Sequence, residues 1–119
     1  MSTNFQYINL DYLDLMSDGD EDMKQTMIEM LLEEIPEEME QMRVLNDEGN
    51  WKELREVSHK MKSTLSFVGN KEMTAANQQV EDIAKVGEGT DALPALLAVL
   101  FDLYPKVLEE LRTIGAAAH

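Results

Sequence analysis

Residues 50–69 read NWKELREVSHKMKSTLSFVG. Apolar or small side chains recur in this stretch every three or four positions, which is the spacing of one face of an α-helix. Asn50 can cap the start of a helix, and Gly69-Asn70 supplies a stop followed by a new cap. We therefore predict a helix between these limits. Its buried seam comprises Trp51, Leu54, Ser58, Met61, Leu65 and Val68.

Three other segments show the same spacing, and the alternation typical of a half-buried strand appears nowhere. The first predicted helix runs from about Asp20 to Leu45, and Pro36 is expected to kink it. Another ends near Gly87, and the last opens at Thr90-Asp91. The predicted seams of these helices are Ile28, Leu32, Ile35, Met39 and Met42; Met73, Ala76, Val80 and Ile83; and Leu93, Leu97, Leu100, Tyr104, Val107, Leu111 and Ile114.

The predicted class is all-α. Short connections between helices of this length make neighbours antiparallel, which favours an up-down-up-down four-helix bundle over about residues 20–114. Residues 1–18 are expected to form an N-terminal extension whose short helix, capped by Asn9 and ending near Met16, covers one end of the bundle. The length of 119 residues fits a single domain. No function is assigned to the tail 115–119, which contains His119.

Composition excludes several classes of function. A net charge of −14 disfavours DNA and RNA, because neutralisation of phosphates by Lys and Arg supplies most of that affinity. The chain has no cysteine, which excludes thiol chemistry and agrees with a cytoplasmic location. No apolar run is long enough to span a membrane. The basic residues are concentrated, since half of them lie within residues 52–71.

His59 follows the seam residue Ser58 and is therefore expected at the edge of the buried stripe, facing solvent. Lys62, Ser63 and Ser66 lie three, four and seven residues later, on the same helix face. An exposed helical histidine is most often only a solvated side chain, and Lys62 could serve only solubility. However, a neutral imidazole is a nucleophile at physiological pH without an activating base, and a nearby cation can stabilise a transferring phosphoryl group.

The segment from Ser58 to Gly69 resembles the signature of histidine-containing phosphotransfer (HPt) domains, in which the histidine is followed by lysine at +3, usually glycine at +4, and glycine at +10. Lys62 and Gly69 match, whereas Ser63 replaces the usual glycine. The resemblance extends over roughly residues 8–112. It implies a helical bundle that carries a phosphoryl group on His59, on Nε2, and exchanges it with the aspartate of a response-regulator receiver domain.

The resemblance also implies roles for neighbouring residues and partners. Lys62 would stabilise the phosphoryl charge, and Ser63 would occupy the position of closest approach. The expected partners are receiver domains and a hybrid sensor histidine kinase, with Mg²⁺ bound by the receiver and no cofactor or metal bound by this chain. It would be a phosphocarrier without kinase or hydrolase activity. The residues expected at the docking surface are Lys52, Arg55, Lys60, Ser66, Gly69 and Lys71.

Two alternatives belong to other classes. An acidic helical module could bind a receiver or a partner helix without being phosphorylated. A di-iron bundle would use Glu-x-x-His elements, of which Glu56 to His59 is one, but the sequence has no second copy. A kinase or hydrolase is disfavoured because the chain has no glycine-rich phosphate loop and no supported Ser/His/Asp set.

Overall fold

The computed structural model describes residues 5–117, with side chains up to residue 114, and His119 lies outside this range. The described chain is helical. Its elements are α1 (Asp11–Ser17), α2 (Glu21–Glu48), α3 (Trp51–Val68), α4 (Lys71–Val86), the 3₁₀ turn η1 (Thr90–Ala92) and α5 (Leu93–Ala117).

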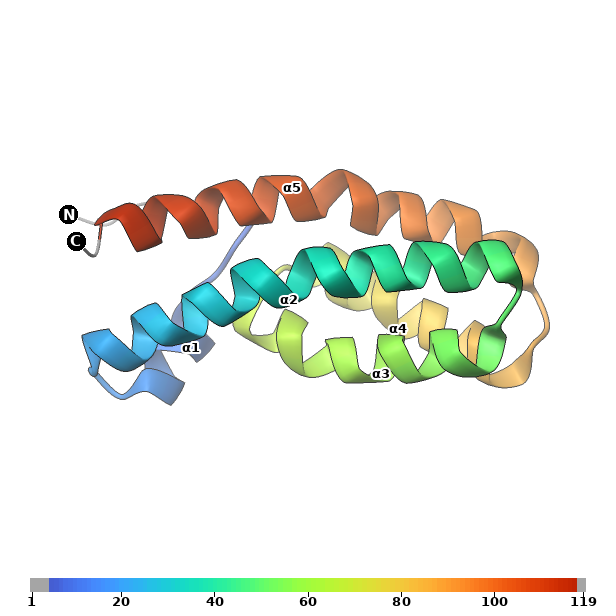
Figure 1. The fold of residues 1–119 in the computed structure, drawn as a ribbon, viewed down its shortest axis with the longest axis horizontal. Helices are drawn as coiled ribbons and strands as arrows, with labels where there is room; N and C mark the ends of the chain where they lie inside the picture. Colours follow the sequence, from blue (N-terminus) through green and yellow to red (C-terminus); the bar gives the residue numbers. More distant parts are fainter. Residues whose placement is uncertain (1–4, 118–119) are drawn as a thin grey trace.

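The four long helices form an elongated bundle of 47 × 21 × 20 Å (Figure 1). Each long helix packs on two others, because α2 contacts α3 and α5, and α4 also contacts α3 and α5. The short helix α1 contacts α2 and α3, and an ion pair of 2.7 Å between Asp14 and Lys24 ties it to α2. Pro36 lies within α2, whose ribbon changes direction near the middle (Figure 1).

The helix ends follow local sequence signals. Asn50 and Asn70 cap α3 and α4 through their side-chain oxygens, and Gly69 ends α3 in the left-handed conformation. The predicted cap of α1 was wrong by one residue: Leu10 is the N-cap, while the Asn9 side chain accepts a hydrogen bond from the Asp11 N–H. The reason is that the backbone N–H of Asn9 bonds to the Val68 carbonyl, which holds this residue in the preceding segment.

The core confirms the predicted seam of α3, although Trp51 is only half-buried. In the other long helices, three of the predicted seam residues are half-buried and have a residue next to them that is buried in their place. Leu31 is buried instead of Leu32, Ala84 instead of Ile83, and Leu103 instead of Tyr104. Every long helix packs against two neighbours. Each therefore buries a face that is wider than a single seam and that is centred between its two neighbouring helices.

Glu38 of α2 is a buried acid, with 2% of its surface exposed. Among the described residues, neither of its carboxylate oxygens has a hydrogen-bond partner by geometry. Burial raises the pKa of Glu38, and the nearby Thr64 hydroxyl and the charge of Lys60 offset only part of this effect. The ionised carboxylate therefore destabilises the folded state.

We expect Glu38→Gln to increase the free energy of unfolding at neutral pH by about 1 kcal/mol, because the amide carries no charge to desolvate. Since the folded-state pKa is raised, the cost of Glu38 is fully present above that pKa and disappears as the pH falls through it. Urea denaturation should show the stability gain shrinking toward acidic pH. Glu33→Gln, at an exposed position of the same helix, is the matched control. Equal stability of the Glu38 variant and the wild type at neutral pH would contradict this prediction.

Candidate functional site

His59 lies in α3, and 70% of its side chain is exposed. The preceding residue, Ser58, is completely buried. The imidazole therefore stands at the edge of the buried stripe, where the helical spacing places it. The orientation of the imidazole ring depends on the neighbouring helix α4.

Glu81 of α4 joins the site residues. Its Oε2 lies 2.6 Å from Nδ1 of His59, and its Oε1 lies 2.7 Å from Nζ of Lys62. The Gln78 side-chain amide donates a weaker bond to Oε1 at 3.3 Å. Only 8% of the Glu81 side chain is exposed. The hydrogen bond from Lys62 lowers the pKa of Glu81, with burial acting in the opposite direction and His59 adding to the lowering.

This contact gives His59 a hydrogen-bond partner that its own helix does not supply. An ionised carboxylate can only accept hydrogen bonds, so Nδ1 must carry the proton that His59 donates to Glu81. In the neutral ring, Nε2 is then the nitrogen with the free lone pair. In this arrangement Nε2 is the ring nitrogen that can act as a nucleophile.

Sequence reasoning missed Glu81. The available signal is its position directly after the seam residue Val80, which places an acid at the edge of an apolar stripe. That signal identifies a half-buried or buried carboxylate, but it does not reveal which turn of α3 faces it. His59 and Glu81 are 22 residues apart in the sequence, and only the packing of α3 on α4 brings them together.

Lys62 and the two serines lie near His59 as their spacing requires. Lys62 is 41% exposed at its side chain, but its ammonium group is paired with Glu81 instead of being free. Ser63 is exposed on the surface of α3. The Ser66 hydroxyl donates to the Lys62 carbonyl, so it bonds back to its own helix.

The remaining predicted residues fall into separate groups. Lys52 and Arg55 are exposed on α3, and Arg55 lines a small hollow together with Glu56 and His59. Lys60 is exposed on α3, and its charge lowers the pKa of Glu38 on α2. A groove between α3, α4 and residues 9–12 is lined in part by Ser66, Gly69 and Lys71.

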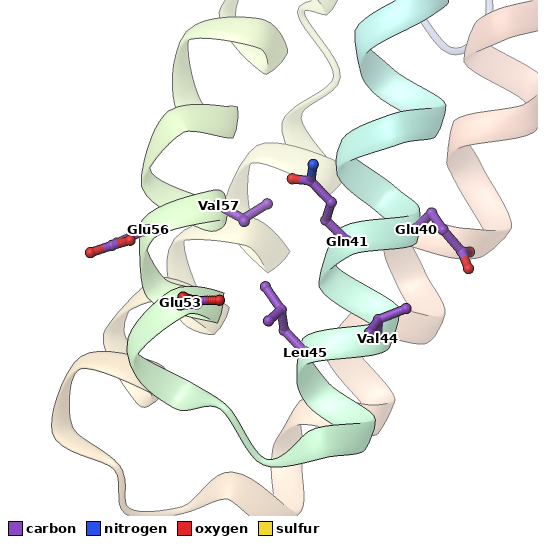
Figure 2. Close-up of a pocket in the computed structure, with 7 residues that line it drawn as sticks. All are labelled: Glu40, Gln41, Val44, Leu45, Glu53, Glu56 and Val57. Carbon is purple, nitrogen blue, oxygen red and sulfur yellow. The ribbon is translucent and has the colours of Figure 1, made fainter.

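A further groove lies between α2 and α3, near the loop that connects them (Figure 2). Figure 2 shows Gln41, Leu45 and Val57 pointing into the space between the two helices, while Glu40 and Val44 point away from it. The groove is therefore distinct from the contact between α3 and α4 that contains Glu81.

Within residues 5–117, no group of three or more His, Cys, Asp or Glu side chains is arranged to hold a metal ion. In the same part of the chain, no helix has the length and apolar character needed to cross a membrane.

The fold and the site together define a class: a helical bundle that presents a histidine, oriented by a carboxylate, on its surface. The family model of the Hpt domain matches residues 26–117, and the chain therefore belongs to the Hpt domain family. Domains of this family are phosphocarrier modules of phosphorelays and not, in general, kinases or hydrolases. Comparisons with curated proteins and with solved structures gave no match.

Proposed function

We propose that this protein is a phosphorelay intermediate that carries a phosphoryl group on Nε2 of His59. The scaffold is an up-down-up-down four-helix bundle with α1 covering one end. The group is received from the aspartyl phosphate of one receiver domain and handed to the aspartate of another. The observation that supports this proposal best is the hydrogen bond between Nδ1 of His59 and the buried carboxylate of Glu81.

The chemistry requires an in-line exchange of bonds at phosphorus. The lone pair of Nε2 forms the N–P bond while the P–O bond to the donor carboxylate breaks, and the proton on Nδ1 stays in its bond to Glu81. Positive charge that develops on the ring is stabilised by the ionised Glu81. Lys62 and His59 contact the same carboxylate, and the Lys62 cation would offset the transferred negative charge when its side chain turns from Glu81 toward the phosphoryl oxygens.

The receiver would dock on the exposed face of α3. Its phosphorylation pocket is acidic and holds Mg²⁺, and the cations of Lys52, Arg55 and Lys71 would steer it toward His59. The groove lined by Ser66, Gly69 and Lys71 offers a recess beside that face. Ser63 occupies the position of closest approach, and a hybrid sensor histidine kinase would supply the first receiver of the relay.

The direct test is incubation of the full chain with a phosphorylated receiver domain and Mg²⁺. The expected product is an acid-labile, base-stable label on the protein, with the N–P bond assigned to Nε2 by ³¹P and ¹⁵N NMR. Return of the label to an unphosphorylated receiver would complete the relay. Binding of the receiver without any label would instead favour a non-phosphorylated interaction module.

We expect Glu81→Ala to slow phosphoryl transfer by about 10- to 100-fold, because the ring loses the group that orients it and supports its developing charge. The rate should be measured at saturating receiver, so that a docking defect does not contribute. Asp82→Ala removes a carboxylate from the adjacent, exposed position of α4 and is the matched control. A rate for Glu81→Ala equal to that of the control would remove Glu81 from the mechanism.

We expect Lys62→Ala to slow transfer and also to lower the free energy of unfolding by about 1 kcal/mol, since Glu81 would lose a charged hydrogen-bond partner. The lowered pKa of Glu81 means that this stabilisation is present above the unfolded-state pKa and is lost as the pH falls through the folded-state value. The stability deficit should therefore vanish in acid. Lys52→Ala, at an exposed position of the same helix, should change stability little at any pH. A deficit that does not depend on pH would contradict this account.

A further inference from the structure

Two buried polar side chains connect α3 and α4 beneath the His59 site. The Ser58 hydroxyl lies 2.7 Å from Oδ1 and 2.9 Å from the carbonyl oxygen of Asn77. In return, the Asn77 side-chain amide donates to the Ser58 carbonyl at 2.9 Å. The two residues have exposed fractions of 0% and 1%. They therefore form a reciprocal pair that is shielded from water.

The backbone atoms in this pair belong to the turns that carry the site. The Ser58 carbonyl is part of the peptide bond that precedes His59, and in an α-helix it accepts the N–H of Lys62. The Asn77 carbonyl likewise accepts the N–H of Glu81. The pair thus joins the turn that bears the imidazole and the ammonium group to the turn that bears the carboxylate.

We infer that Ser58 and Asn77 are positioning residues, which fix the register between α3 and α4 so that one carboxylate reaches both His59 and Lys62. The inference rests on the proposed function of His59. It adds two residues that touch neither the phosphoryl group nor the receiver and that act only through Glu81.

Directional bonds are needed here because, apart from the Ser58–Asn77 pair and the contacts of Glu81 with His59 and Lys62, most of the side chains that α3 and α4 bury are apolar. Leu54, Met61 and Val80 are completely buried, and apolar burial alone has no strong preference for one axial position. A hydrogen bond weakens steeply as its angle departs from linearity, and it is strengthened in a buried environment. A small slide of α4 along α3 would break the Ser58–Asn77 pair and lengthen the 2.6 Å contact between His59 and Glu81.

The test uses Ser58→Ala and Asn77→Ala in the full chain, with Thr64→Val as the matched control. Thr64 is also a buried hydroxyl residue of α3, but its hydroxyl acts on Glu38 of α2. The first measurement is the tautomer of His59 from the ¹⁵N shifts of its ring. A free histidine side chain prefers the proton on Nε2, whereas the bond to Glu81 requires it on Nδ1. The second is the pKa of Glu81 from a ¹³C titration of its carboxyl group, and the third is the transfer rate.

We expect both variants to shift His59 away from the Nδ1–H tautomer, to bring the pKa of Glu81 closer to its ordinary value, and to slow transfer by about 10-fold, since small misplacements of a reacting group are costly. Thr64→Val should leave all three unchanged. Folded variants with the wild-type tautomer and Glu81 pKa would overturn the inference, as would loss of the fold in both. The tautomer and the titration need no receiver. If the wild-type chain takes up no label, the proposed function is wrong, but the tautomer of His59 and the pKa of Glu81 still test this inference.

Discussion

His59→Gln is expected to abolish the acid-labile label, because the side chain that replaces the imidazole has no nucleophilic nitrogen. The fold should survive, since 70% of the His59 side chain is exposed and glutamine is a good helix former. We expect the free energy of unfolding to change by less than about 1 kcal/mol, as for most surface substitutions. The measurement pairs the labelling reaction with urea denaturation and circular dichroism.

His119→Gln is the control for this experiment. It removes the other histidine of the chain, which lies in the tail outside the described residues, and should leave the label intact. Label that persists in His59→Gln and disappears in His119→Gln would transfer the proposed role to the tail. Label that persists when both histidines are replaced would mean that the phosphoryl group is not carried on a histidine.

Gly69→Ala is expected to lower the free energy of unfolding by about 3 kcal/mol, the largest stability change that we predict for a single substitution. Gly69 has a φ of +72°, a conformation that costs an L-residue roughly 1–2 kcal/mol. An added Cβ would also lie 2.6 Å from the carbonyl oxygen and 2.8 Å from the Cβ of Asn9. The backbone of the N-terminal segment would therefore have to move.

That segment has little freedom to move because it is held on both sides. The backbone N–H groups of Gln6, Tyr7 and Ile8 donate to the carboxylate of Glu110 on α5. The Asn70 side chain donates to the Tyr7 carbonyl. Displacing Asn9 would disturb these bonds, which explains why the expected cost exceeds that of the backbone conformation alone. The glycine at this position thus has a structural role, and its role in docking stays a prediction.

Gly87→Ala separates the two contributions to the stability loss expected for Gly69→Ala, which are the backbone conformation and the contact with Asn9. Gly87 ends α4 with a φ of +78°, but apart from its two chain neighbours no residue has a heavy atom within 4 Å of an added Cβ. We expect this variant to lose only about 1 kcal/mol, from backbone conformation. Equal losses in the two variants, measured by chemical denaturation, would show that the contact with Asn9 contributes nothing.

The sequence by itself determined the helices and the exposed position of His59. Apolar spacing, the caps Asn50 and Asn70, and the stop at Gly69 are local signals, and each is satisfied within a few residues of chain. For the same reason the seam of α3 could be predicted from its own periodicity. The resemblance carried by Lys62 and Gly69 agrees with the family match over residues 26–117.

Only the tertiary structure decided what surrounds the histidine. The contact of Glu81 with His59 and Lys62, the Ser58–Asn77 pair and the approach of Asn9 to Gly69 all join segments that are distant in sequence. Helical periodicity specifies which side of a helix is buried, but it does not specify which turn of the next helix lies opposite. That axial register is set by the packing of whole helices, so the chemical surroundings of His59 could not be predicted from the sequence.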